Sequence, residues 1–440
     1  MKQIASNVLI ALAYAIAYVV CYVYFLNFHF GYFGFELYPQ STAFLALSIG
    51  LSVIPVLCYR GLRAISSVLA TFTYLLLYVP IVLTFALGSN RSPVEIFVIQ
   101  SVFLVCMCLI FMADLIVVKS PFDLRLRIDL AKWVLVLTAV CTLYVLFVYR
   151  SNLRFVSFAD VYEQRFENAD LGQGLVARYV AAWLYSVMIP LCLAYGLVSR
   201  RYTYFWIGSA ACVTIYMATA AKGAVVLPVV YLGFFLLFAR NRLRGIFGLL
   251  TASMAVTIGL LTLVQDTTSV MFWVSSIVLM RTIGTAGLLT RTYYDFFLTH
   301  PRTYYTHIGL IGKVSGAYPF DVPVGQAVGQ YYWSWDMNAN ANFWATDGIA
   351  AMGMVGVVVS TVLCVLLFGV LNTVTRTHNK LFVALCFLPF LVQLFNTSLL
   401  SSIWSGGGLL LIVFFLLSGE AEGATPIRPD GEHQSSATPA

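Results

Sequence analysis

Residues 246–264 read IFGLLTASMAVTIGLLTLV, a run without a charged side chain. An apolar run of ~20 residues is long enough to cross the hydrocarbon core of a bilayer as a helix. Only helices and closed barrels satisfy the backbone in lipid, and a continuously apolar run favours the helix over an alternating strand. Similar runs recur along the chain, which predicts an all-α polytopic integral membrane protein.

The composition of the whole chain supports this fold class. Hydrophobic residues are 61% of the 440 and charged residues 10%, whereas soluble domains carry roughly 25% charged residues. We expect about twelve transmembrane helices, at 4–25, 41–58, 64–86, 93–117, 132–149, 177–198, 203–219, 224–239, 246–264, 347–370, 381–397 and 404–418. Residues 1–420 then form a single transmembrane domain, with long loops at about 150–176 and 265–346, and 421–440 form a disordered cytoplasmic tail.

Residue usage argues against a cleaved signal peptide, a metal or cofactor site and a nucleic acid partner. The first apolar run has no small-residue cleavage site, so we expect it to stay as a helix. The nine cysteines lie in or beside apolar runs with no Cys-x-x-Cys pair, which predicts reduced packing residues, with no metal site and no cofactor. The formal charge of +7 comes without a basic patch rich in stacking aromatics, so no nucleic acid partner is expected.

The positive charges orient the chain in the membrane. With the N-terminus inside, short loops on that side hold fifteen of the twenty-five Lys and Arg residues, including the RNRLR cluster at 240–244. The positive-inside bias therefore places both termini in the cytoplasm and the long loops in the periplasm of a bacterial inner membrane. The apolar run 269–290 is expected to be an interfacial or re-entrant helix. Full crossing is the alternative, and it would invert the orientation of everything after it.

Ten cations fall on the outside, more than this bias predicts. A cation at the membrane centre costs ~2.5–3.5 kcal/mol, so misplaced cations are candidates for function. Headgroup anchoring explains Arg91, Arg150 and Arg178. Arg165, in the first long loop, can bind a phosphate through its guanidinium fork, or can belong to an ordinary interfacial helix. Lys222 lies in a short turn near the membrane plane, where it either holds a lipid diphosphate or snorkels to the headgroups.

The segment 265–346 carries most of the candidate chemistry. Arg281, Asp295 and His300 bring a cation, a carboxylate and an imidazole to the aqueous side. Glycosyl transfer needs such groups, because a sugar hydroxyl must lose a proton and a departing diphosphate must be neutralised. Alternatively, Arg291 and Asp295, four residues apart, form an internal ion pair, and His300 simply ends a helix.

Aromatic and amide side chains alternate over residues 331–348, YYWSWDMNANANFWATDG. Aromatic faces beside Asn and Asp suit carbohydrate, although aromatic belts are also common at membrane interfaces. The candidates for sugar contact are Tyr294, Trp333, Trp335, Asp336, Asn340 and Asn342. Gly348, Gly353 and Gly356 are expected to allow close helix packing at the start of the next span.

Together these elements resemble the Wzy-type O-antigen or oligosaccharide repeat unit polymerases over roughly residues 150–360. The resemblance rests on Tyr162 to Arg165, the turn at Lys222, the run from Arg281 to His300, and the segment from Asn340 to Gly348. The chain departs from members that carry Arg-x15-Gly repeats in two external loops, because that spacing is absent here.

The resemblance implies a GT-C-like, metal-independent glycosyltransferase that needs no cofactor. Such an enzyme moves a growing glycan from undecaprenyl diphosphate onto a lipid-linked repeat unit, among membrane lipids and beside a chain-length regulator and a flippase. We expect the lipid diphosphates to be bound by Arg165, Lys222, Arg281, Arg291 and Arg302. Arg281 also counts as catalytic, with Asp295 or His300 as the base and Asp336 and Asp347 as further candidates.

Three other functions remain open at the level of sequence. An O-antigen ligase shares the lipid-linked donor and an Arg- and His-rich external loop. A twelve-helix transporter or lipid-linked glycan flippase usually shows internal repeats and charges in mid-span, which this chain lacks. A structural protein of an envelope complex is excluded only by an activity test.

Overall fold

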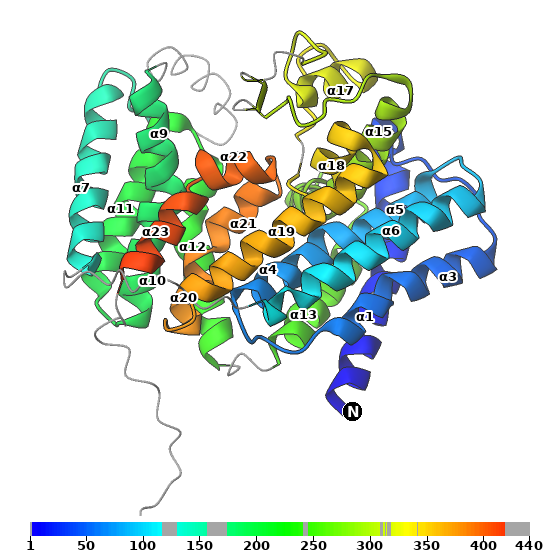
Figure 1. Cartoon of the computed structure of the whole chain (residues 1–440), viewed down its shortest axis with the longest axis horizontal. Helices are drawn as coiled ribbons and strands as arrows, with labels where there is room; N and C mark the ends of the chain where they lie inside the picture. The colour runs from blue at the N-terminus through cyan, green and yellow to red at the C-terminus, as the bar shows by residue number, and fades with distance from the viewer. Residues whose placement is uncertain are drawn as a thin grey trace, which may run out of the picture.

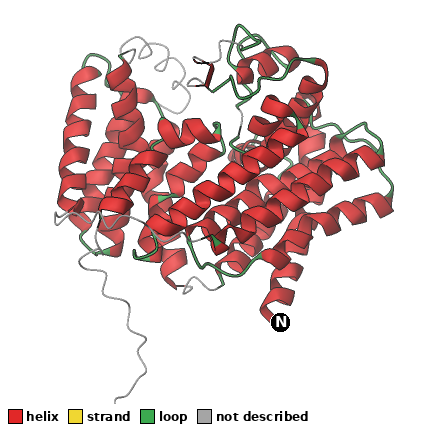
Figure 2. Cartoon of the chain, viewed as in Figure 1, coloured by secondary structure: helices red, strands yellow, loops and turns green. Residues whose placement is uncertain are grey.

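The computed structural model describes residues 2–116, 130–155, 174–240, 245–308, 311–312, 314, 318–340 and 342–418. Helices are the regular elements of this part of the chain (Figures 1 and 2). The predicted tail at 421–440 and most of the first long loop lie outside the described residues.

Most predicted spans are occupied by helices that begin and end within a few residues of the expected positions. The principal helices are α1 (Lys2–Cys21), α3 (Thr42–Val53), α4 (Ile65–Thr73), α5 (Val79–Gly88), α6 (Pro93–Met112), α7 (Leu130–Val148), α9 (Leu175–Trp183), α10 (Ile189–Val198), α11 (Tyr202–Thr219), α12 (Lys222–Arg240), α13 (Ile246–Thr262), α14 (Val270–Ser275), α15 (Thr285–Thr299), α17 (Val324–Tyr332), α18 (Ala345–Met352), α19 (Met354–Val374), α20 (Lys380–Cys386), α21 (Leu388–Leu394), α22 (Leu399–Trp404) and α23 (Gly408–Leu417).

Several of these join end to end into longer helices. Seven described helices are long and apolar enough to cross a membrane: Gln3–Phe33, Ile65–Gly88, Pro93–Leu115, Ala131–Val148, Val176–Val198, Val270–Thr299 and Met354–Val374. Four shorter apolar helices accompany them. These helices support a multi-pass membrane protein. All nine cysteines are free, in buried or half-buried positions, as packing residues should be.

Two of the last three predicted spans are broken: 347–370 between α18 and α19, and 381–397 between α20 and α21. The chain turns at Gly353, whose φ of +67° and ψ of −144° separate α18 from α19. Residues with a Cβ rarely adopt such a conformation. Gly348 and Gly356 meet across this turn with no room for a side chain on either, which confirms the predicted close packing. Phe387 separates α20 from α21, which has a proline in its first turn, and Gly407, at a φ of +88°, directly precedes α23, which fills most of the predicted span 404–418.

One end of the helix bundle gathers the ends of several helices, and we call it the distal end because it lies away from the N-terminus (Figure 1). Helix Gln3–Phe33 runs parallel to Ile65–Gly88: the Tyr14 hydroxyl donates to the Leu75 carbonyl, and the Tyr38 amide donates to the Leu87 carbonyl. The C-terminal ends of both helices therefore lie together at the distal end.

Helix Val270–Thr299 contacts the distal end at both of its own ends. The Phe272 ring lies 4.8 Å from the His29 ring at one end of the helix. At the other end Arg291 reaches the Gly88 carbonyl, and Asp295 pairs with Arg91. Although its 30 residues are sufficient by length and composition to cross a membrane, both ends of this helix lie on the same side of the bundle.

Candidate functional site

An open pocket of about 760 Å³ lies at the distal end. Four separate segments form its wall: the end of the first long helix with the turn after it, the connection between α5 and α6 with the start of α6, helix α15, and the end of α17 with the residue after it. The side chains that matter chemically are Glu36, Tyr38, Arg91, Glu95, Arg291, Asp295, Tyr332 and Trp333. Two of the four segments belong to the stretch 265–346, in which the sequence predicted aqueous chemistry.

Arg91 links two carboxylates in this pocket. Its Nη2 lies 2.6 Å from Asp295 Oδ1, its Nε lies 3.2 Å from the same oxygen, and its Nη1 lies 2.6 Å from Glu95 Oε1. Burial alone would lower the Arg91 pKa, but the hydrogen bonds and charges of Asp295 and Glu95 outweigh burial and raise it. The side chain is 21% exposed and has two protein partners, so the structure gives no support to headgroup anchoring of Arg91, which stays a prediction.

Arg291 has a different set of partners from the one that its spacing suggested. Its guanidinium is buried and donates to the carbonyl oxygens of Gly34 and Gly88, joining the turn after the first helix to the end of α5. Asp295 is paired with Arg91 instead, so the Arg291–Asp295 ion pair of the alternative interpretation is not formed. Arg291 lines the pocket, but two of its nitrogens already bind the protein backbone.

Aromatic side chains cover the other wall of the pocket. Trp333 stacks on Phe33 with ring centroids 5.1 Å apart, and its Nε1 donates to the Phe33 carbonyl. Burial, helped by the negative charge of Asp295, raises the pKa of Tyr332 to about 12. Tyr294 stands just behind the lining, with the Arg91 guanidinium 5.0 Å from its ring centroid. Three of the sequence candidates, Asp295, Arg291 and Trp333, thus meet in one pocket.

Several other predicted site residues do not line this pocket. Arg281 is exposed in a π-helical segment, Ser276–Gly284, and Arg302 is exposed beside Gly353. Lys222 is the first residue of α12 and is half-buried. Arg165 lies outside the described residues. The structure therefore leaves the diphosphate-binding roles of these four cations as predictions.

The remaining candidates divide into exposed and buried residues. Trp335, Asp336 and Asn340 are exposed and lie outside the pocket lining. His300 stacks face to face on Phe296, with centroids 3.9 Å apart, and its Nδ1 lies 3.0 Å from the Phe296 carbonyl oxygen. Asn342 is buried, and its Oδ1 accepts from the amides of residues 344 and 345 at the start of α18. Its position supports a role in helix capping and does not support sugar contact.

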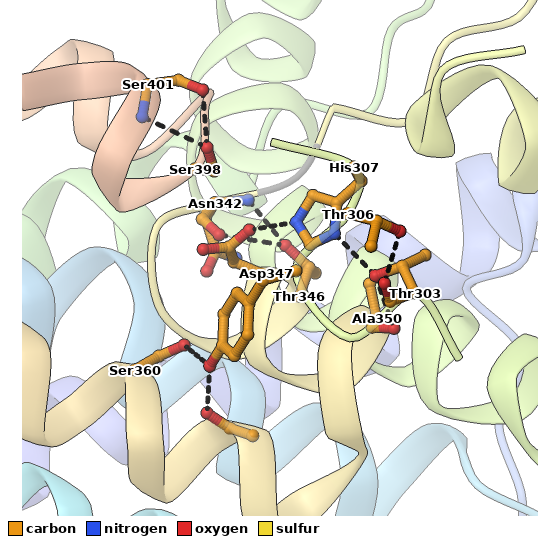
Figure 3. A network of polar contacts seen from close by, with 12 residues as sticks. Thr303, Thr306, His307, Asn342, Thr346, Asp347, Ala350, Ser360, Ser398 and Ser401 are labelled. Atoms are coloured by element: carbon orange, nitrogen blue, oxygen red, sulfur yellow. Dashed lines mark hydrogen bonds and ion pairs between the residues drawn. The ribbon is translucent and has the colours of Figure 1, made fainter. Parts of the chain in front are cut away.

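A second polar cluster joins α18 to the segment that follows α15 (Figure 3). His307 Nε2 lies 2.6 Å from Asp347 Oδ1, and His307 Nδ1 lies 2.6 Å from the Thr303 hydroxyl. Both side chains of the His–Asp pair are nearly inaccessible, at 4% and 2% exposure. The Thr303 hydroxyl also donates to the Ala350 carbonyl, which is 3.0 Å away. This buried pair connects the two segments, which favours a structural role for Asp347, and its predicted role as a further candidate base stays a prediction.

Sequence reasoning missed Arg91, Glu95 and Glu36 as pocket residues. The available signal was weak: a cation and a carboxylate four residues apart at the start of α6, on the same predicted side as segment 265–346. No group of three or more potential metal ligands occurs among the residues that the structure describes. No protein-family model, curated protein or solved structure matches the chain, so what the pocket can do follows from its own residues.

Proposed function

We propose that this chain is a polymerase-type membrane glycosyltransferase. It transfers a growing glycan from undecaprenyl diphosphate onto a lipid-linked repeat unit at the periplasmic face of the bacterial inner membrane. The distal end then faces the periplasm, in keeping with the excess of Lys and Arg in loops of the opposite side. Helix Val270–Thr299 has both ends on the distal side, which favours the interfacial or re-entrant arrangement and preserves the orientation of the later helices.

The observation that carries this proposal is the combination of carboxylates and aromatic faces in one water-accessible pocket at that end. Asp295 is the preferred base. Its Oδ1 is fixed by Arg91, whereas its Oδ2 accepts no hydrogen bond from the described residues and can receive one from an acceptor hydroxyl. His300 is less suited, because its ring stacks on Phe296 outside the pocket lining.

The transfer step follows from this arrangement. The acceptor hydroxyl passes its proton to Asp295 Oδ2 while its oxygen attacks the anomeric carbon of the donor. The bond from that carbon to the diphosphate breaks, and the diphosphate leaves with the electron pair. Arg91 acts as a positioning residue for the base. Tyr332 and Trp333 offer ring faces to the acceptor sugar.

The diphosphate of the donor is bonded to the carbon that is attacked, and it leaves on the side of that carbon opposite to the acceptor oxygen, so it must be neutralised at the mouth of the pocket and not inside it. Glu36, Glu95 and Asp295 outnumber the two guanidinium groups of the pocket, so a diphosphate is repelled there at neutral pH. We therefore assign the pocket to the acceptor sugar. Arg281 and Arg302, both exposed, together with Lys222 and Arg165, remain the candidates for the lipid diphosphates.

The glycan profile of a deletion strain tests the proposal. Loss of the chain should abolish the ladder of long glycans and leave single-repeat species, and re-expression should restore the ladder. A ladder that survives the deletion contradicts a polymerase. If the deletion strain accumulates long lipid-linked chains that fail to reach a lipid A core, the chain is a ligase instead.

A further inference from the structure

A second cavity, of about 490 Å³, lies at the opposite end of the helix that leads to the first pocket. Ile65 lines this cavity and Gly88 lines the distal pocket, and the two residues are the ends of one 24-residue helix. At about 1.5 Å per residue that helix is roughly 35 Å long. The second cavity therefore opens at the side of the bundle on which the N-terminus lies, remote from the proposed transfer site.

The cavity is rich in positive charge. Arg63, Arg376 and Lys380 line it, all three are exposed, and no ion pair joins any of them to a carboxylate in the described part of the chain. One carboxylate, that of Asp114, shares the cavity. Its Oδ1 is buried without a hydrogen-bond partner. The cavity thus offers three cations and one vacant acceptor.

The rest of the lining decides between classes of phosphate-bearing ligand. Leu62, Ile65, Val68, Val383 and Ala384 form an apolar wall. The described lining contains no aromatic ring on which a nucleotide base would stack. An amphiphile with a charged phosphate end and an apolar body matches both halves of the cavity.

We propose that this cavity binds the phosphodiester headgroup of an anionic lipid from the leaflet on the N-terminal side. The phosphate lies among Arg63, Arg376 and Lys380, and a headgroup hydroxyl donates to Asp114 Oδ1. The glycerol and acyl region follows the apolar wall. Phosphatidylglycerol has this combination of one negative phosphate and free hydroxyl groups. Each Lys or Arg near a membrane surface contributes about fivefold to the affinity for an anionic lipid.

Native mass spectrometry of the purified full-length chain, titrated with phosphatidylglycerol in detergent, tests the proposal. The double variant R63Q/R376Q should lose about 25-fold in affinity, from ~5-fold for each cation. The charge-preserving R63K/R376K should bind close to wild type. R200Q is the matched control, because Arg200 is exposed at the same end of the bundle, where Tyr195 contacts Phe382, but does not line the cavity.

Three results would overturn the assignment. These are equal affinity of R63Q/R376Q and wild type, a loss of affinity in R200Q as large as in the double variant, and displacement of the lipid by inorganic phosphate at equal concentration. The last result would point to a soluble phosphate ligand. The measurement involves no glycan, so it succeeds or fails independently of the proposed polymerase activity.

Discussion

Arg291 was expected to bind a diphosphate, and its position in the structure makes a different outcome of substitution measurable. The residue is 8% exposed, and its guanidinium donates to the carbonyls of Gly34 and Gly88. Removing the partner of a buried polar group costs ~1–3 kcal/mol. Because both carbonyls border the pocket, water can partly replace the lost donors. We therefore expect Arg291→Ala to destabilise the fold by about 2–4 kcal/mol.

Arg291→Lys is the informative companion variant. An ammonium keeps the charge but cannot span both carbonyls as the guanidinium fork does, so about half of the loss, ~1–2 kcal/mol, should remain. Thermal unfolding of the purified chain in one detergent and at one scan rate measures both variants. The midpoint should fall in the order wild type, Lys, Ala. Unchanged midpoints combined with lost activity would refute the structural role and restore diphosphate binding.

Three further changes test the pocket and the fold. Arg91→Gln should slow polymerisation about tenfold with little change in KM, because Asp295 loses the group that orients it. The polymerisation rate of Arg91→Lys should lie between those of wild type and Arg91→Gln. Trp333→Ala should raise KM for the acceptor by ~2–10-fold, from about 0.5–1.5 kcal/mol of lost ring contact, whereas Trp333→Phe should stay near wild type. Gly353→Ala should lower stability by about 1–3 kcal/mol because of its φ of +67°, while Gly233→Ala, with open space around the new methyl, should not. An equal effect of the two glycine substitutions on the unfolding midpoint contradicts the strained turn.

The positions of the helices were largely predictable, because the length of an apolar run is a local property of the sequence. The breaks were not. Residues 347–370 read as one apolar run, and only the contact between Gly348 and Gly356 shows that the chain turns back at Gly353. Likewise, the proline in the first turn of α21 does not show from sequence alone whether the helix breaks before it or continues through it with a kink.

The site was partly predictable for a related reason. Counting spans placed residue 91 and segment 265–346 on one side of the membrane, and that segment did supply Asp295 and Trp333 to the pocket. The partner of Asp295 is 204 residues away along the chain, and a pairing across that separation depends on helix packing. The same holds for His307 and Asp347, whose separation of 40 residues gives no local pattern.

Polymerisation by purified protein supplied with lipid-linked repeat units tests the central claim most directly. Asp295→Asn preserves the size of the side chain but removes the base, and should reduce the rate by ~10²–10⁴-fold. The unfolding midpoint should fall only slightly, because one partly exposed ion pair with Arg91 is lost. Asp266→Asn is the control, because that exposed carboxylate bonds only locally, to Thr268. We predict long products from wild type and Asp266→Asn and single repeats from Asp295→Asn. Long products from Asp295→Asn at the wild-type rate would contradict the account.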